Sequence, residues 1–346
     1  MKATTPARLA LPLAMVTMAW AIGPLLLVGL AQAATPTTVD SAGNNAVTTS
    51  CSGVAVGSSA NLVSTVSNAS SGTTFCLQSG TFSIGSAAVK PKDGDKLIGV
   101  APTVGTNDSI SATSKIVGTG AQIIDVGNAK NVDLENLDVS GATGTSTCSP
   151  QCGRGISQGN NLSVAYSRIH NNAATGIGGG GSGGLFSHLE VDHNGSSPFT
   201  SCCAGGIKSA HPFTVDSSFV HDNVGNGVWE DVCGTSLVVT NNTLSGNTFS
   251  GARYEHNQSC SGSATITGNL VTNNNLAANG GAAGIAINSV GGATVANNTL
   301  GGNIKAGIKV GGTRGPVTGT SIHDSTLNKD VVKGCTLSGV TCYNNI

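Results

Sequence analysis

Two short motifs alternate along this chain, and their repetition constrains its fold more than any other feature. The first motif is a glycine followed by an aliphatic or small residue, and the second is a segment that ends in asparagine. Copies of the first lie 21 to 33 residues apart, at Gly155-Ile156, Gly176-Ile177, Gly206-Ile207, Gly227-Val228, Gly251-Ala252, Gly284-Ile285 and Gly307-Ile308. Copies of the second are residues 164–172, 215–223, 239–247, 266–274 and 295–303, with looser copies at 186–194 and from Leu134. A repeat of about twenty residues with two short strands is typical of a β-solenoid.

Stacking explains why such a repeat folds. One repeat has too little apolar surface to fold alone, but stacked repeats place Ile, Val and Leu of successive coils over one another. The unequal intervals predict loop insertions at one corner, before the Gly-Ile strand. A leucine-rich repeat is the main alternative, but its Leu-x-x-Leu-x-Leu spacing is absent. A β-sandwich would not repeat its residues in register.

The asparagines that end the second motif form one predicted column at a corner of the solenoid. Asparagine tolerates the left-handed backbone conformation that a sharp corner needs, and its amide can bond its neighbours in the coils above and below. The column consists of Asn172, Asn194, Asn223, Asn247, Asn274 and Asn303, and a partial second column of Asn242, Asn269 and Asn298. We interpret these asparagines as structural.

The composition agrees with an ordered fold and limits the partners. The formal net charge is -1, charged residues make up 10% of the chain, and glycine occurs 50 times. The mean hydropathy of +0.11 is too apolar for a disordered chain. No basic patch or arm is present in the sequence, so we expect no nucleic-acid partner.

The first 33 residues have the pattern of a secretory signal peptide. Lys2 and Arg8 precede an apolar stretch over residues 9–30, and Ala-Gln-Ala at 31–33 resembles a cleavage site. An uncleaved membrane anchor is the alternative, although a Gly-Pro pair at 23–24 interrupts the apolar stretch.

From this pattern we expect a secreted, extracellular protein that has no membrane contact after cleavage. Residues 34–50 would form a flexible mature N-terminus. Residues 51–346 would form a single β-helix domain with an N-terminal cap and a disulfide-bonded C-terminal end.

All ten cysteines lie in the expected mature chain. They are Cys51, Cys76, Cys148, Cys152, Cys202, Cys203, Cys233, Cys260, Cys335 and Cys342. An even number in an exported protein indicates disulfides rather than a metal site. We expect two local pairs, Cys51 with Cys76 and Cys335 with Cys342, and leave the other partners open.

One part of the chain resembles a known family. Residues 205–229, which contain GGIK, FVHDN and GNGVW, are similar to the right-handed parallel β-helix repeat proteins of the broad pectate-lyase-like superfamily. Residues 79–98 resemble the first coils of such helices, and the resemblance extends over most of residues 51–320. It implies an all-β fold, a right-handed parallel β-helix (β-solenoid). It does not imply one activity, because the superfamily holds lyases, hydrolases, epimerases and non-catalytic adhesive or cell-wall proteins.

Aligning the coils on the Gly-Ile strand predicts two columns of side chains on one outward face, because alternate residues of a strand share a face. The column one residue after the aliphatic position reads Ser157, Gly178, Lys208, Trp229, Arg253, Ala286 and Lys309. The column three residues after it reads Gly159, Gly180, Ala210, Asp231, Glu255, Asn288 and Gly311. Three central coils therefore place five candidate residues side by side, namely Lys208, Trp229, Asp231, Arg253 and Glu255.

These residue types suit sugar chemistry. Asp231 and Glu255 would share a proton or hold a cation such as Ca²⁺ between them. In a hydrolase, one acid would protonate the leaving oxygen while the other activates water or attacks. In a uronate lyase, a cation or Arg253 would neutralise the substrate carboxylate, and Lys208 or Arg253 would remove the adjacent proton. Trp229 offers a flat surface for a sugar ring.

Further candidates lie around these five. His221 and Asp222 end a neighbouring strand and would flank the cleft, and His256 is an additional acid–base candidate. Tyr254 is a second aromatic candidate unless alternation turns it inward. The structural alternative is an ion-pair ladder in which Asp231 pairs with Arg253 and Glu255 pairs with Lys208.

The known enzyme motifs are absent from the sequence. There is no Gly-His-Gly with the paired aspartates of polygalacturonases, no Asp-Pro-His-Asp of mannuronan epimerases and no Arg-x-Pro-x-x-Arg of many pectate lyases. Our first hypothesis is a monomeric secreted β-helix that acts on or binds polysaccharide as a lyase or hydrolase. The alternative is a non-catalytic extracellular β-helix that binds a cell-surface glycan or serves a structural role.

Overall fold

The computed structural model describes residues 38–39, 45–46, 50–144, 153–196, 204–231, 236–256, 262–289, 292–311 and 317–346. Residues 34–346 form one compact unit. The predicted signal peptide and most of the predicted flexible N-terminus lie outside the described residues and stay predictions. Among the described helices, none is both long and apolar enough to cross a bilayer.

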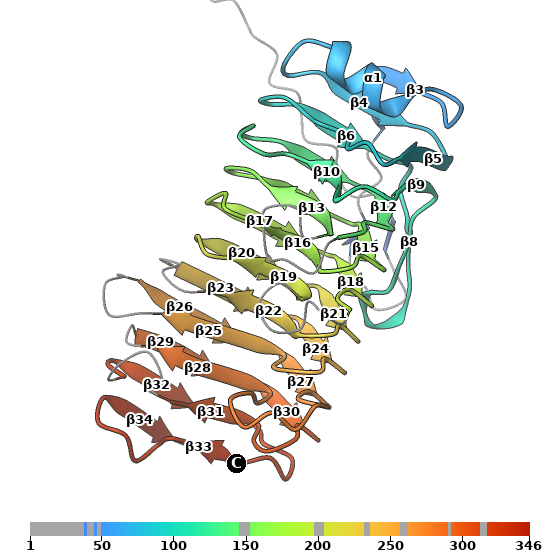
Figure 1. Cartoon of the computed structure of the whole chain (residues 1–346). Helices are drawn as coiled ribbons and strands as arrows, with labels where there is room; N and C mark the ends of the chain where they lie inside the picture. The colour runs from blue at the N-terminus through green and yellow to red at the C-terminus, as the bar shows by residue number, and fades with distance from the viewer. Residues whose placement is uncertain are drawn as a thin grey trace, which may run out of the picture. The chain divides into compact units, whose positions relative to one another are not determined.

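Three long parallel sheets wind around one core, as the sequence and its resemblance predicted (Figure 1). Sheet 1, in spatial order, is β10 (Gln122–Asp125), β13 (Arg154–Gln158), β16 (Thr175–Gly179), β19 (Gly205–Ser209), β22 (Asn226–Glu230), β25 (Ala252–His256), β28 (Ile285–Ser289), β31 (Ile308–Val310) and β33 (Val332–Lys333).

Sheet 2 has twelve strands. They are β3 (Val54–Val56), β4 (Thr74–Leu77), β6 (Lys96–Ile98), β11 (Asp133–Glu135), β14 (Ser163–Ala165), β17 (Gly184–Ser187), β20 (Phe213–Asp216), β23 (Ser236–Thr240), β26 (Ser263–Thr267), β29 (Gly292–Ala296), β32 (Thr320–His323) and β34 (Val340–Tyr343).

Sheet 3 completes each coil. Its strands are β30 (Thr299–Gly301), β27 (Leu270–Thr272), β24 (Thr243–Ser245), β21 (Phe219–His221), β18 (Glu190–Asp192), β15 (Arg168–His170), β12 (Leu137–Ser140), β9 (Ser114–Gly118) and β5 (Gly80–Gly85). One coil therefore runs from sheet 1 to sheet 2 to sheet 3 and then enters sheet 1 one rung further on. The fold is a right-handed parallel β-helix.

The remaining elements lie outside these sheets. The strands β1 (Thr38–Val39) and β2 (Asn45–Ala46) pair antiparallel, as do β7 (Thr103–Val104) and β8 (Ile110–Ser111). A 3-10 helix, η1 (Thr106–Asp108), lies between β7 and β8. The helix α1 (Leu62–Asn68) lies at the N-terminal end of the coils (Figure 1) and buries Leu62 and Val66.

Stacked aliphatic side chains fill the interior. In sheet 1, Ile156, Ile177 and Ile207 are register partners on successive strands, and each is at most 1% exposed. Sheets 2 and 3 contribute equivalent buried columns, such as Val164 beneath Phe186 and Ile169 beneath Val191. The core is thus a column of like residues, as the repeat predicted.

The asparagine ladders are confirmed, but the ladder asparagines do not themselves adopt the left-handed backbone conformation that was predicted for them. Within the first ladder, Asn194 donates its amide hydrogen to Asn223 Oδ1 at 3.1 Å, and Asn223 donates to Asn247 at 3.1 Å. The left-handed backbone falls on the preceding residue, for example Asp222 with φ of 50°. The corner needs this conformation just before the ladder residue, which then turns its side chain inward and is buried.

Insertions occur at all three corners, whereas the sequence predicted one. Between sheets 2 and 3, residues 99–113, which contain β7 and β8, connect β6 to β9. Before sheet 1, residues 193–204 connect β18 to β19, but residues 222–225 suffice between β21 and β22. After sheet 1, residues 257–262 connect β25 to β26, but residues 210–212 suffice between β19 and β20. The interval between two Gly-Ile motifs is the sum over all three corners of a coil, so it does not show which corner holds the insertion.

Two predicted disulfides are confirmed, Cys51–Cys76 and Cys335–Cys342. The first joins the segment before β3 to β4, and the second joins the segment before β34 to that strand, so each lies near one end of the helix. The other six cysteines lie outside the described residues.

Candidate functional site

Lys208, Trp229 and Arg253 stack on three successive strands of sheet 1, as predicted. Trp229 of β22 is the register partner of Lys208 in β19 and of Arg253 in β25. Asp231 directly follows β22, and Glu255 lies at the equivalent position of β25. We call these five residues the Trp229 cluster.

Direct contacts join all five members. The Lys208 ammonium lies 3.9 Å from the centre of the Trp229 ring and 3.0 Å from Asp231 Oδ2. The Trp229 indole N–H donates to Glu255 Oε2 at 3.1 Å, and Arg253 Nη2 donates to Glu255 Oε1 at 3.0 Å. The Arg253 guanidinium lies 5.4 Å from the Trp229 ring. The indole therefore lies between two cations, each of which is paired with a carboxylate.

The ion pairs differ from the ladder considered above. Asp231 pairs with Lys208 and Glu255 with Arg253, so the predicted partners were exchanged. The reason is local: Arg253 and Glu255 lie two residues apart on one strand and share its outward face. The four charged side chains are only 4–28% exposed, and Trp229 is 8% exposed. The cluster is therefore partly enclosed rather than a solvated surface ladder.

Alternation turns the intervening residues inward. Tyr254 is fully buried in the core, which removes it from the candidate surface. Its register partner Glu230 is also fully buried, a buried carboxylate that was not predicted from the sequence. The signal was available, because Glu230 follows Trp229 by one residue and must face the other way.

The structure does not bring His221 and Asp222 to the Trp229 cluster. His221 ends β21 of sheet 3, and Asp222 follows it, whereas the cluster lies on the outer face of sheet 1. The prediction that His221 and Asp222 flank the cluster was therefore wrong, because closeness along the chain does not show which sheet a residue belongs to. His256 ends β25, and its side chain is outside what the structure describes.

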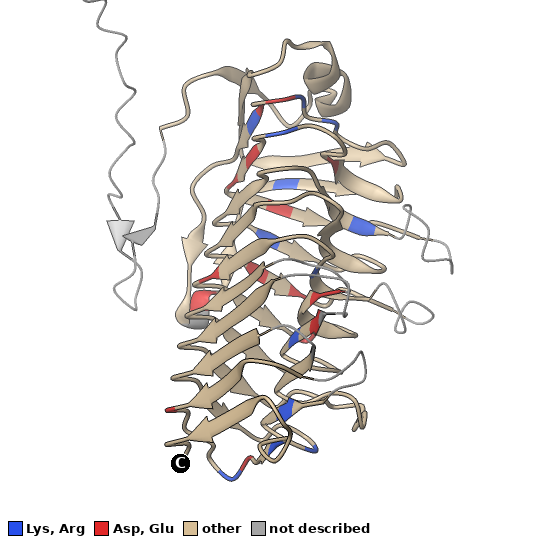
Figure 2. Ribbon diagram, turned by 90° about the vertical axis from the view of Figure 1, so that its left-hand side faces the viewer, with Lys and Arg blue, Asp and Glu red and all other residues tan. Residues whose placement is uncertain are grey.

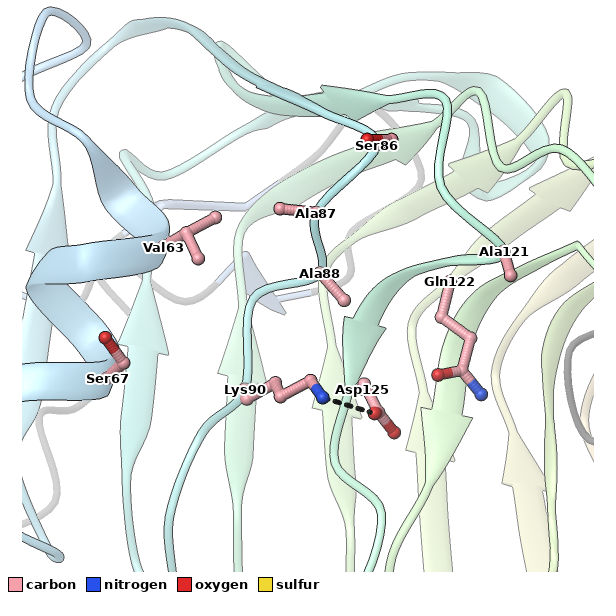
Figure 3. Close-up of a pocket in the computed structure, with 9 residues that line it drawn as sticks. All are labelled: Val63, Ser67, Ser86, Ala87, Ala88, Lys90, Ala121, Gln122 and Asp125. Atoms are coloured by element: carbon pink, nitrogen blue, oxygen red, sulfur yellow. Dashed lines mark ion pairs between the residues drawn. The ribbon is translucent and has the colours of Figure 1, made fainter.

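Charged residues are sparse along the coils and occur in small groups of mixed sign (Figure 2). A hollow of about 510 Å³ lies at the N-terminal end of sheet 1, between α1, residues 86–90 and β10 (Figure 3). Lys90 and Asp125 line it side by side, with Nζ and Oδ2 3.7 Å apart. We call it the α1 pocket.

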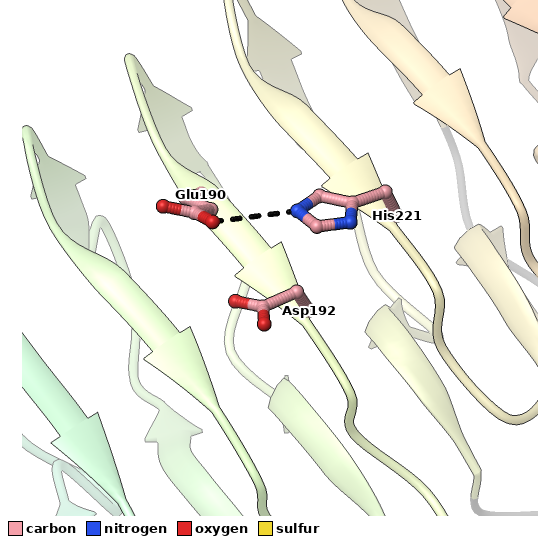
Figure 4. Close-up of side chains that lie close together, drawn as sticks. All are labelled: Glu190, Asp192 and His221. Atoms are coloured by element: carbon pink, nitrogen blue, oxygen red, sulfur yellow. Dashed lines mark hydrogen bonds and ion pairs between the residues drawn. The ribbon is translucent and has the colours of Figure 1, made fainter. Parts of the chain in front are cut away.

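A second charged group, missed in the sequence, lies on sheet 3. Arg168 of β15 donates to both carboxylate oxygens of Asp192, at 2.9 and 2.7 Å. Glu190 accepts the backbone N–H of Ile110 at 2.6 Å, which fixes the β7–β8 segment to β18, and lies 3.4 Å from His221 Nε2 (Figure 4). We call Arg168, Glu190, Asp192 and His221 the Arg168 cluster.

Contacts within the Arg168 cluster shift the pKa values of Asp192 and His221. Burial would raise the pKa of the Asp192 carboxyl, but hydrogen bonds from Arg168 and His193 outweigh it, so this pKa lies below its ordinary value. Burial would lower the pKa of His221, but its bonds to Glu190 and Asp222 raise this pKa above the ordinary value. Both shifts favour the charged forms that hold the cluster together.

Neither cluster has the donor set of a metal site. Possible ligand atoms of Glu190, Asp192 and His221 lie within 4.8 Å of one another, but Arg168 already occupies both oxygens of Asp192 with a positive charge. Asp231 and Glu255 are likewise engaged by Lys208 and Arg253. Calcium takes six to eight oxygen ligands. The described side chains around Asp231 and Glu255 therefore do not fit the Ca²⁺ considered from sequence.

Three parallel sheets around one core define a right-handed parallel β-helix. Solved structures with this fold match the chain. An alginate lyase from Paenibacillus sp. str. FPU-7 matches with a TM-score of 0.57 and 14% identity, over 83% of this chain and 98% of that one. The pectate lyase Pel9A matches with a TM-score of 0.57 and 14% identity, over 87% and 81%. No family model and no curated protein matches the sequence. At such identities the likeness concerns the fold.

Proposed function

We propose that this protein is a secreted polysaccharide lyase that binds an acidic glycan along the outer face of sheet 1. The observation that carries the proposal is Trp229 held between Lys208 and Arg253, with two carboxylates in contact. The flanking cations suit an anionic sugar, and an indole face, now covered by them, would meet the sugar ring once Lys208 or Arg253 turns to the sugar carboxylate. The two structural neighbours are named as lyases of alginate and of pectate, which supports this substrate class.

The residues would divide the work of a β-elimination. Arg253 would neutralise the uronate carboxylate, which makes the adjacent C–H more acidic. Lys208, as the neutral amine after it leaves Asp231, would accept that proton and become an ammonium. The C–O bond to the leaving sugar then breaks, a C=C bond forms between the two ring carbons, and the leaving oxygen takes up a proton from water. Before substrate binds, Asp231 and Glu255 would hold the two basic side chains in position through their ion pairs.

Hydrolysis is less well supported by the geometry. A glycosidase needs one carboxylic acid that donates a proton. Both oxygens of Glu255 instead accept bonds, one from Trp229 and one from Arg253. Asp231 is engaged by the Lys208 ammonium.

Non-catalytic glycan binding is a second candidate, because the four charges of the Trp229 cluster are already paired with one another. A lyase must open at least one of these pairs when substrate binds, whereas a binding protein need not. The same assays distinguish the two.

The test is an assay of the purified mature protein on alginate, pectate, chondroitin and neutral glycans. We expect ultraviolet absorbance from an unsaturated uronate with an acidic glycan. New reducing ends without that absorbance would contradict elimination and indicate hydrolysis. Binding without either product would favour the non-catalytic candidate, and absence of both binding and product would refute the function.

Secretion belongs to the same proposal. The predicted cleavage after Ala33 and the two disulfides support an oxidising, extracellular destination. We expect the exported protein to begin at Ala34, which N-terminal mass spectrometry can check. An intact residue 1–33 segment would contradict it.

A further inference from the structure

The α1 pocket lies on the same outward face as the Trp229 cluster. Register pairs connect the two: Asp125 in β10 pairs with Ser157, Ser157 with Gly178, and Gly178 with Lys208. Asp125 is thus an earlier member of the column that contains Lys208, Trp229 and Arg253. The sequence alignment missed it because Ile123, not glycine, precedes the aliphatic Ile124 in this coil.

The column between the two sites holds only small residues, Ser157 and Gly178. A Cβ added to Gly178 would lie 2.8 Å from Thr175 Oγ1 and 3.5 Å from Arg154 Nε, so these two side chains lie close to the Gly178 position and a glycan on this path would contact them. With rungs about 4.8 Å apart, three rungs separate Asp125 from Lys208 by about 14 Å.

The lining of the α1 pocket has the chemistry that recognises sugars. Lys90, Asp125 and Gln122 supply charged and amide groups for hydroxyls, and Figure 3 shows them on one side of the hollow. Ala87 and Ala88 supply a small apolar wall. Lys90 is 68% exposed, and its 3.7 Å pair with Asp125 is loose enough to open for a ligand.

We propose that the α1 pocket is a distal binding site for the same glycan chain whose reacting part lies at Trp229. Its ligand is one hydroxyl-bearing pyranose unit, three to four rungs from the Trp229 cluster. This inference rests on the proposed function, and it adds that the protein favours chains long enough to reach both sites. A pyranose unit advances a glycan by roughly one rung, so about four units would span the distance.

The experiment compares acidic oligosaccharides of two and six units, prepared from alginate and from pectate. Trp229 is the only tryptophan outside the predicted signal peptide, so its fluorescence reports occupancy of the cluster, while calorimetry reports total binding. For the unaltered protein we expect the hexamer to bind at least tenfold more tightly than the dimer. In Gln122→Ala/Asp125→Ala, hexamer affinity should fall about tenfold, to near the dimer value, with dimer affinity unchanged.

One further variant serves as a control and another as a substitute for the double variant. Asp133→Ala opens the comparable Lys96–Asp133 pair on sheet 2, 3.3 Å apart, and should change neither affinity. Lys90→Ala, at an exposed position, tests the pocket if the double variant does not fold, and should weaken hexamer binding alone.

The outcomes separate the two proposals. Equal affinity of the unaltered protein for dimer and hexamer, or equal loss of both in the pocket variants, would overturn the distal site while leaving the proposed function intact. Binding of neither oligosaccharide from either source would overturn both proposals.

Discussion

The Trp229 and Arg168 clusters arise by the same route but differ in what their charges contact. Each is assembled from residues on neighbouring rungs, about 4.8 Å apart, that lie far apart along the chain. In the Arg168 cluster, Asp192 is fully buried, is held bidentately, and lies beside a carboxylate that fixes the β7–β8 segment. In the Trp229 cluster, two single ion pairs flank an aromatic ring. A group of charges therefore does not identify a binding site by itself. Ion pairs that can open beside an aromatic ring, as in the Trp229 cluster, are better suited to binding a ligand.

The largest expected effect is on stability, from Arg168→Ala. This change leaves Asp192 buried without its bidentate partner and should lower the free energy of unfolding by about 3 kcal/mol. Chemical denaturation measures it. The control Lys96→Ala removes an exposed pair and should cost less than about 1 kcal/mol. Equal losses of stability for both variants would show that the buried bidentate pair contributes no more than an exposed pair.

Trp229→Ala should act on function instead. We expect kcat/KM on the acidic glycan to fall about 100-fold, because the ring that positions the sugar and both cations is lost. The matched control is Phe219→Ala, which removes an aromatic ring stacked on His221 in sheet 3 and should leave kcat/KM unchanged. A normal rate for the Trp229 variant would place the reaction elsewhere.

A smaller expected effect is the pH dependence of stability that arises from His221 in the Arg168 cluster. The pKa of His221 is raised in the folded protein, so protonated His221 stabilises the fold fully below its unfolded pKa of about 6.5. This contribution is lost as the pH rises through the folded pKa. Unfolding followed from pH 6 upward should show a decline in stability that His221→Gln lacks. An identical decline in both proteins would assign the effect to other groups.

The pKa of Asp192 is lowered, so its contribution has the opposite sign. It is present above the unfolded pKa of about 3.9 and is lost as the pH falls through the folded value. It therefore does not disturb the measurement around His221.

The smallest expected effect is that of metal removal. Because Lys208 and Arg253 engage the two carboxylates of the Trp229 cluster, treatment with EDTA should leave glycan turnover unchanged. Loss of turnover that calcium restores would mean that a cation replaces one of these pairs.

The sequence was sufficient to predict the fold and the stacking of Lys208, Trp229 and Arg253, because the Gly-Ile repeat aligns coils regardless of loop length. It could not assign residues to faces across a corner, and so it grouped His221 with residues of another sheet. The ion-pair partners within the Trp229 cluster could not be predicted, because they depend on side-chain conformations around Trp229. The α1 pocket could not be predicted, because the coil that contains Asp125 has Ile123 where the other coils have the glycine of the motif.

The two corners that flank sheet 1 vary in length, whereas residues 217–218, 241–242 and 268–269 form equally short turns between sheets 2 and 3. The outer face of sheet 1 and the connections at its two edges are therefore specified by different parts of the sequence. Exchanging these connections should leave the register of the rungs unchanged, so the proposed glycan selectivity could be engineered on a constant scaffold.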